Sequence, residues 1–448
     1  MDNIYFRAVI LIVAIFFGAA SWATARRRLH PAHRLSLDYM LSMFSITYAL
    51  GCCVLFLFQA DYLYRFYGAG AFLPNRTSFS LILVLTLAPY LVIPWTVTFM
   101  ASVSRPKYLA HAQVGIRAPA IRNDALIFAS ATILLASLAL LAPVVGTLAS
   151  NALNDLFATT SAASLYEQRQ SVFENVSFVQ GGIIYSVLPA LSAILLFWRG
   201  PSPRLERATG SAVAIIAVIM NLGMFQIGPT LSFLLTCGFC YAVSRQGRLN
   251  IVAIATVGTL MLILLFLYSL IKVTGNQLSQ AELFIMRLPI PLPYLIQMSG
   301  EYPNALSPHY SLPFELGQYM FPELRAAQGF VAMPQPAYID AWFTYSPFVS
   351  IFVMLFISFL VTAFGNKFKR YGFDRAGDNQ RLTLWIVIAA PALYYAFQVD
   401  ILALFVSAYS VTFAAIPSVA IFISSILLSG LTKGSSQAVG PNISLERE

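Results

Sequence analysis

The chain has 448 residues, of which 58% are hydrophobic and only 10% are charged. Soluble domains carry about 25% charged residues, so this composition excludes an ordinary soluble protein. The formal net charge of +9 does not predict nucleic-acid binding, because most Lys and Arg residues lie in short segments that flank apolar runs. Membrane proteins place their positive charge in this way. We therefore expect membrane lipids, and no nucleic acid, among the partners.

Apolar runs of about 18 residues or more recur along the chain, and most are long enough to cross a hydrocarbon core of about 30 Å. They predict an all-α, polytopic integral membrane protein with about 11 transmembrane helices and one large extracytoplasmic loop. The predicted spans are 5–24, 36–58, 79–103, 125–149, 175–198, 209–224, 227–243, 250–272, 341–364, 383–402 and 408–431.

These spans divide the chain into four regions. Residues 1–272 form an N-terminal membrane domain with eight spans, and residues 273–340 form an extracytoplasmic loop with the candidate active site. Residues 341–431 form a C-terminal membrane domain with three spans. Residues 432–448 are rich in Ser and Gly, and we expect a disordered cytoplasmic tail there.

The distribution of positive charge predicts the orientation. With the N-terminus outside, the cytoplasmic segments are 25–35, 104–124, 199–208, 244–249, 365–382 and the C-terminal tail. All but seven of the 27 Lys and Arg residues lie in these segments, which is the bias that the positive-inside rule requires. The segments 59–78, 150–174 and 273–340 are then extracytoplasmic.

The segment 273–340 is too polar and too rich in proline to be a membrane helix. Ten of the 24 prolines lie between Pro289 and Pro347, and proline breaks regular helices because it lacks a backbone donor. Loops of this length are usually functional or disordered, and the many Tyr and Phe residues here argue against disorder. We therefore predict a folded extracytoplasmic cap that carries the chemistry.

Arginines are present on the extracytoplasmic side, where the orientation rule disfavours positive charge. The five are Arg65, Arg76, Arg169, Arg287 and Arg325. The planar guanidinium suits phosphate oxygens, so these residues are candidates for binding the diphosphate of a lipid head group. Interfacial or paired surface arginines are the alternative interpretation. Arg287 is the most suggestive, because it lies in an apolar stretch that three prolines interrupt.

Carboxylates and an imidazole follow in the same segment. Glu301, His309 and Glu315 are candidate catalytic residues, since a general base for a sugar hydroxyl needs a carboxylate or an imidazole within hydrogen-bond reach. A structural or solvated role is the alternative for each. The Cys237-Gly-Phe-Cys240 pair lies inside an apolar run without a second ligand pair, which favours small core residues over a metal or redox site.

The architecture resembles that of the Wzy-type polymerases, which polymerise the repeat units of O-antigen, exopolysaccharide or capsule. The resemblance rests on the many helices, the large outer loop in the second half and the few helices that follow it. The stretch FQIGPTLSFLLTCGFCYAVSRQGR is similar to a short-turn helix of that family, and MPQPAYIDAWFTYSPFVSIFVMLFI resembles the family's re-entry from the outer loop. The family's arginine with a glycine eleven residues later is absent at Arg287 and Arg325, which leaves open which outer arginines bind.

The resemblance implies a glycosyltransferase of the bacterial cytoplasmic (inner) membrane, with a fold similar to the GT-C class. Its substrate would be a polyprenyl-diphosphate-linked oligosaccharide, with the outer arginines stabilising the leaving diphosphate. It implies no metal and no other cofactor, in line with the lack of an Asp-x-Asp motif in the outer loops. An O-antigen ligase and a flippase or transporter of the lipid-linked oligosaccharide are alternatives. The sequence leaves open whether a chain-length regulator also binds.

Overall fold

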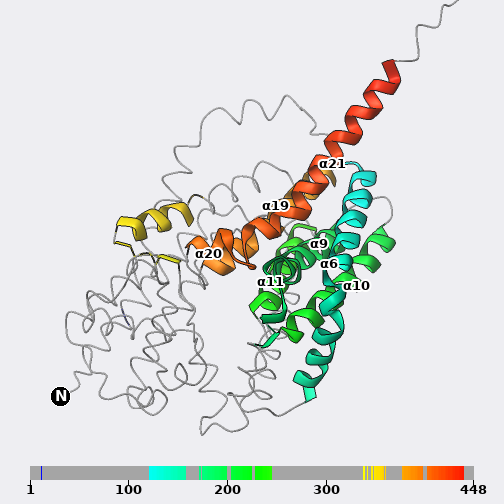
Figure 1. Cartoon of the computed structure of the whole chain (residues 1–448). Helices are drawn as coiled ribbons and strands as arrows, with labels where there is room; N and C mark the ends of the chain where they lie inside the picture. Colours follow the sequence, from blue (N-terminus) through cyan, green and yellow to red (C-terminus); the bar gives the residue numbers. More distant parts are fainter. Residues whose placement is uncertain are drawn as a thin grey trace, which may run out of the picture.

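The structure is a computed structural model. It describes residues 12, 121–157, 171–172, 174–198, 203–224, 228–244, 337–338, 341, 345–346, 348–357, 359, 376–396 and 401–437. Within these ranges every regular element is helical and none is a strand, which confirms the all-α prediction for this part of the chain. The elements with labels are α6 (Asn123–Phe157), α8 (Phe178–Gly182), η2 (Ile183–Val187), α9 (Leu188–Phe197), α10 (Pro203–Gly223), α11 (Gly228–Ser244), α19 (Ala376–Ala396), α20 (Ile401–Val406) and α21 (Val411–Gln437) (Figure 1). A short apolar helix covers Phe348–Ile357.

Four of the described helices are long and apolar enough to cross a membrane. They are Asn123–Leu153, Phe178–Phe197, Arg204–Gly223 and Leu402–Ser429. Each overlaps a predicted span, so the prediction of a membrane protein is confirmed at this level. The total of 11 spans stays a prediction.

The run formed by α8, η2 and α9 is the centre of this group. The share of its span that is buried is 83%, compared with 28–39% for the other three spanning helices. The α9 helix packs against α10, α11, α19 and α21, and α6 packs against α10 and α21. Hydrophobic side chains of α9 such as Leu191 and Ile194 are fully buried, because neighbouring helices surround them on all sides.

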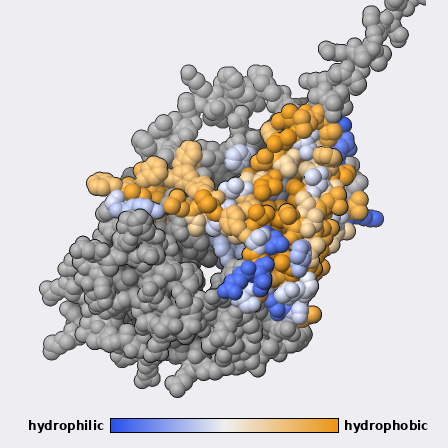
Figure 2. Space-filling model, viewed as in Figure 1, coloured by the Kyte–Doolittle hydropathy of each residue, from blue (hydrophilic) through white to orange (hydrophobic). Residues whose placement is uncertain are grey.

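The outer helices expose apolar faces. On α6 the exposed side chains include Phe128 and Leu135, and on α21 they include Phe422 and Leu427. Figure 2 shows this surface as a broad hydrophobic area over α21 and the helices beside it. Exposed apolar area of this extent is unusual for a soluble protein, and it is the surface that a helix presents to lipid.

The central run is interrupted by a π-helical turn, and its sequence explains why. The run begins with a capping box, in which the Ser177 N–H donates to Gln180 Oε1 at 2.8 Å and the Gln180 N–H donates to Ser177 Oγ at 3.3 Å. Pro189, in the first turn of α9, has no N–H for the carbonyl of Tyr185 four residues earlier. The Leu188 N–H donates to the carbonyl of Ile183, five residues earlier, in place of the usual four. The extra residue per turn accommodates the proline ring.

At one end of the bundle, hydrogen bonds and a ring contact connect the ends of neighbouring helices. The Ile121 N–H, just before α6, donates to Gln380 Oε1 of α19 at 3.2 Å. Trp198 Nε1, directly after α9, donates to Asn123 Oδ1 of α6 at 3.3 Å. The rings of Phe197 and Tyr241 contact each other with centroids 6.4 Å apart, which brings the end of α11 beside the end of α9.

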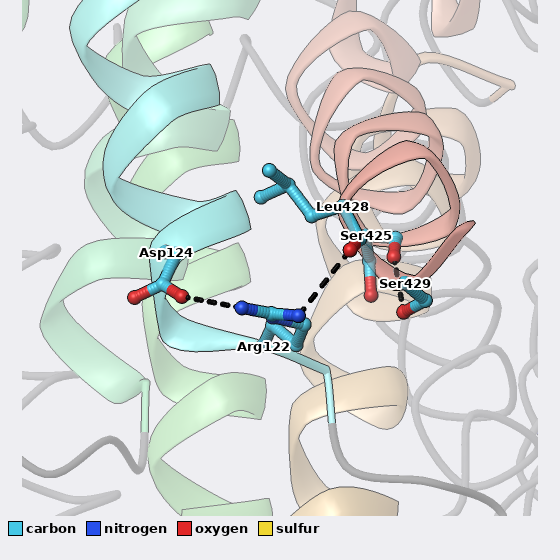
Figure 3. Close-up of polar contacts among 5 residues, drawn as sticks. All are labelled: Arg122, Asp124, Ser425, Leu428 and Ser429. Atoms are coloured by element: carbon cyan, nitrogen blue, oxygen red, sulfur yellow. Dashed lines mark hydrogen bonds and ion pairs between the residues drawn. The ribbon is translucent and has the colours of Figure 1, made fainter. Parts of the chain in front are cut away.

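Arg122 connects the same end of the bundle to α21. Its Nη2 forms an ion pair with Asp124 Oδ2 at 2.9 Å, and its Nη1 donates to the carbonyl of Leu428 at 3.3 Å (Figure 3). The hydroxyl of Ser429 on α21 donates to the Ser425 carbonyl at 2.6 Å. The α21 helix therefore runs antiparallel to α6, and its last residues project past the start of α6 (Figure 1).

The described basic residues all lie at this end, which we call the basic end. They are Arg122, Arg204, Arg207, Arg381 and Lys433. At the basic end α6, α10 and α19 begin and α9, α11 and α21 end. Among these six helices, three therefore run in one direction and three in the other.

Several helix ends differ from the sequence prediction. The α10 helix begins at Pro203 instead of residue 209, because proline is favoured at a first helical position and the charged residues after it do not interrupt the helix. The α19 helix begins at Ala376 instead of residue 383, and the separate helix α20 follows it. The α21 helix continues to Gln437, so the first six residues of the predicted tail are helical.

Candidate functional site

The site residues predicted from the sequence lie outside the described residues. These are the candidate catalytic residues Glu301, His309 and Glu315 and the candidate diphosphate-binding residues Arg65, Arg76, Arg169, Arg287 and Arg325. Their roles remain predictions. The described residues do, however, define the helical scaffold that receives the last part of the predicted outer segment.

The end of the segment 273–340 packs into the hydrophobic core. Ala337 and Tyr338 are buried there, with 1% and 3% of their surface exposed. The hydroxyl of Ser350, on the helix that follows, donates to the carbonyl of Tyr338 at 2.6 Å. The rings of Phe356 on that helix and Phe405 on α20 contact each other with centroids 6.0 Å apart. The predicted outer segment is thereby anchored to the helices that carry the cluster described next.

Four tyrosines, three of them buried and one half-buried, form an aromatic group that we call the tyrosine cluster. It consists of Tyr185 on η2, Tyr394 and Tyr395 on α19 and Tyr409 between α20 and α21. The rings of Tyr185 and Tyr409 stack with centroids 4.6 Å apart. Tyr395 contacts Tyr409 at 5.4 Å and Tyr394 at 5.1 Å. Contacts of this kind add to the stability gained from burying the rings.

Backbone and side-chain contacts fix the turn that carries Tyr409. The Ser186 hydroxyl on η2 donates to the Ala408 carbonyl at 3.1 Å. Ser410 caps α21, since its hydroxyl accepts from the Phe413 N–H at 3.4 Å. A Cβ added to Gly182 would lie 2.5 Å from the Phe413 ring, so any larger residue there would have to displace this ring. The π-helical turn and the start of α21 are therefore held directly against each other.

Polar atoms near the cluster lack hydrogen bonds. Asn221 at the end of α10, Thr230 at the start of α11 and Tyr395 on α19 are buried, with 1%, 7% and 3% of their surface exposed. Neither amide atom of Asn221 has a hydrogen-bond partner, and neither do the hydroxyls of Thr230 and Tyr395. Nearly all buried polar atoms in native proteins have a hydrogen-bond partner. These atoms are therefore exceptions, and their hydrogen-bonding capacity is unused.

Another polar group without a partner lies toward the basic end. Glu206 on α10 has 6% of its surface exposed, and both of its carboxylate oxygens lack hydrogen bonds. It occupies the buried stripe of α10 that continues through Gly210, Val213 and Ala217. Burying a polar group without a hydrogen-bond partner costs free energy, so we expect Glu206 to lower the stability of the packing at this end.

The cysteine pair forms part of the helix packing. Cys237 and Cys240 lie on α11 as free thiols, and Cys240 belongs to the hydrophobic core. No group of three or more His, Cys, Asp or Glu side chains within the described ranges is arranged to hold a metal ion.

The sequence analysis did not identify the tyrosine cluster. Two signals were present: the Tyr394-Tyr395 pair inside an apolar span, and Pro189 placed where a helix must break its regular bonding. Comparison of the chain with protein-family models, curated proteins and solved structures finds no match.

Proposed function

We propose that the protein is a membrane glycosyltransferase that polymerises polyprenyl-diphosphate-linked oligosaccharide repeat units at the outer face of a bacterial cytoplasmic membrane. The observation that carries the proposal is the collection of the described basic residues at one end of the bundle. Positive charge favours the cytoplasmic side. Together with the orientation expected from the sequence, this supports an extracytoplasmic location for the segment 273–340, with Arg287 and Arg325.

The chemistry of that segment suits transfer of a glycan between lipid carriers. The acceptor hydroxyl loses its proton to Glu301, His309 or Glu315 and bonds to the anomeric carbon of the donor. The bond from that carbon to the diphosphate oxygen breaks, and the lipid diphosphate leaves. The outer arginines stabilise the negative charge on this leaving group. Guanidinium groups supply the countercharge, so the step needs no metal.

The arginines give the proposal a direct test. Arg287→Ala and Arg325→Ala are compared with wild type for the rate at which the reconstituted protein lengthens lipid-linked glycans. We expect at least one of the two variants to lose about 100-fold or more of the rate, since removal of one group that stabilises developing charge typically has an effect of this size. Arg207→Ala is the matched control, because Arg207 is exposed at the basic end, and it should retain the wild-type rate.

Expression and membrane insertion of every variant are measured in parallel. Full activity of both Arg287→Ala and Arg325→Ala would contradict the role of these arginines. A loss that extends equally to Arg207→Ala would show that any removal of positive charge impairs the protein, and would remove the support that the arginines give to the proposal.

A further inference from the structure

Three buried side chains from three helices have unsatisfied polar atoms at one end of the bundle. Asn221 lies in the last turn of α10, Thr230 in the first turn of α11 and Tyr395 in the last turn of α19. All three are more than nine-tenths buried, and none of their side-chain polar atoms makes a hydrogen bond. Each group gives up its hydration on folding and gains no protein partner in exchange.

The packing brings the three side chains to the same part of the bundle. The α11 helix packs against both α10 and α19, and η2 contacts α10 and α11. The Tyr395 hydroxyl faces the Ser232 side chain, two residues after Thr230. Only residues 224–227 separate α10 from α11, which keeps Asn221 near the start of α11. This region lies at the opposite end from the basic residues.

The chemistry of the three groups selects the kind of ligand. An amide and two hydroxyls each supply both donors and acceptors, and none of them carries a charge at neutral pH. A ligand hydroxyl both donates and accepts, so it can satisfy all of these atoms, whereas an ionised phosphate only accepts and would leave Asn221 Oδ1, which cannot donate, without a partner. The unmet hydrogen bonds therefore suit a neutral, hydroxyl-rich molecule.

We propose that Asn221, Thr230 and Tyr395 form a subsite for the hydroxyl groups of a carbohydrate, which is the acceptor sugar in the reaction proposed above. This inference rests on the proposed function for the identity of the sugar. The three side chains are enclosed in the described packing, so the ligand enters when the ends of α10 and α11 move apart from α19. The adjacent π-helical turn at Ile183–Val187 is a common feature of functional sites in helices.

Other buried hydroxyls of the same bundle provide controls, because they are already satisfied. The Thr236 hydroxyl on α11 donates to the Ser232 carbonyl at 2.8 Å, and the Ser192 hydroxyl on α9 donates to the Gly210 carbonyl at 2.9 Å. Thr236 has 2% of its surface exposed, so it matches Thr230 in residue type, helix and burial. It differs in having a hydrogen bond, and the inference assigns it no contact with a ligand.

The test measures the accessibility of single cysteines in the full-length protein, reconstituted in liposomes. The natural cysteines Cys52, Cys53, Cys237 and Cys240 are first replaced by Ala. Asn221→Cys, Thr230→Cys and Thr236→Cys are then made separately and treated with a membrane-impermeant thiol reagent. We expect labelling of the first two variants and a several-fold slower reaction after addition of a lipid-linked repeat unit. The Thr236→Cys variant should show no such protection.

Two results would overturn the subsite. Labelling of Asn221→Cys and Thr230→Cys that the repeat unit does not slow would show that water alone reaches these positions. An absence of labelling under all conditions would show that the helices do not part. Kinetics give a second readout: Asn221→Leu and Thr230→Val should raise KM for the acceptor several-fold with a smaller change in kcat, whereas Thr236→Val should change neither.

The outcomes for the subsite and for the proposed function are separable. If the repeat unit protects Thr230→Cys while the wild-type protein makes no polymer, the subsite stands and the polymerase function fails. If the wild-type protein makes polymer and the repeat unit protects neither Asn221→Cys nor Thr230→Cys, the subsite fails and the function stands.

Discussion

The contact between α9 and α10 leads to a prediction about helix packing. A Cβ added to Gly210 on α10 would lie 2.8 Å from the Leu196 backbone nitrogen and 3.0 Å from the Leu195 Cβ on α9. Backbone atoms cannot rotate away as a flexible side chain can, so Gly210→Ala must push the two helices apart. The Ser192 hydroxyl, which donates to the Gly210 carbonyl at 2.9 Å, then loses its partner.

The expected change in the free energy of unfolding of Gly210→Ala is the sum of three effects. Alanine gains about 1 kcal/mol over glycine in a helix interior. Overpacking of a well-packed core costs about 1–3 kcal/mol, and loss of the buried hydrogen bond costs about 1–2 kcal/mol more. Gly210→Ala should therefore lower the free energy of unfolding by about 1–4 kcal/mol, which corresponds to an apparent Tm lower by several degrees.

Gly238 on α11 is the matched control, because a Cβ added there meets nothing within 4 Å. Gly238→Ala should raise the stability by up to about 1 kcal/mol or leave it unchanged. The measurement is thermal unfolding of both purified variants in the same detergent, followed by intrinsic fluorescence. If Gly210→Ala is as stable as Gly238→Ala, the close packing of α9 on α10 is wrong.

Four further predictions concern topology, packing and polar burial. A reporter fused after Ser307 should be active only outside the cytoplasm, and a cytoplasmic signal would invert the orientation. Gln380→Ala should cost about 1–3 kcal/mol in unfolding free energy, because it leaves the Ile121 N–H buried without a partner; an unchanged Tm would contradict that bond. Tyr409→Ala should lower the Tm by several degrees because both ring contacts are lost; an unchanged Tm would argue against the stack. Glu206→Leu should raise the Tm, since both carboxylate oxygens are buried without hydrogen bonds, and a lower Tm would reveal a partner for this side chain.

The sequence predicted the helical fold well where apolar runs were long. The spans 125–149 and 175–198 lie almost entirely within α6 and the run from α8 to α9, because about 20 consecutive apolar residues have few alternatives to a membrane helix. The start of α10 was placed too late because Arg204 and Arg207 were assigned to a loop. Charge marks the membrane boundary, but a helix continues past that boundary when its backbone bonds and first-turn residues favour it.

The tyrosine cluster shows what the sequence could not provide. Its members come from η2, α19 and the turn before α21, and more than 200 residues separate Tyr185 from Tyr394. Hydrophobicity identifies a span but not the rotation of its faces when the helix is surrounded on all sides, as α9 is. Tyr185, which stacks on Tyr409, lies within the π-helical turn, and a helical period taken from the sequence does not include such a turn.

The candidate catalytic and diphosphate-binding residues were predicted on a different basis. Arg287, Glu301 and His309 were chosen from charge placement and residue chemistry, and they lie outside the described residues. The scaffold adds to that prediction in one place, since Tyr338 anchors the end of the outer segment in the core. The buried polar atoms of Asn221 and Thr230 required the structure, because no sequence pattern states which hydrogen bonds are unmade.

The most direct test of the proposed function is reconstitution of the wild-type protein in liposomes with lipid-linked repeat units on the accessible side. Glycan length is followed by gel electrophoresis over time, with empty liposomes as the control. A polymerase predicts a ladder of products that lengthens with time. The absence of any ladder, together with transfer of intact lipid-linked substrate to the protected side of the bilayer, would contradict the polymerase and identify a transporter.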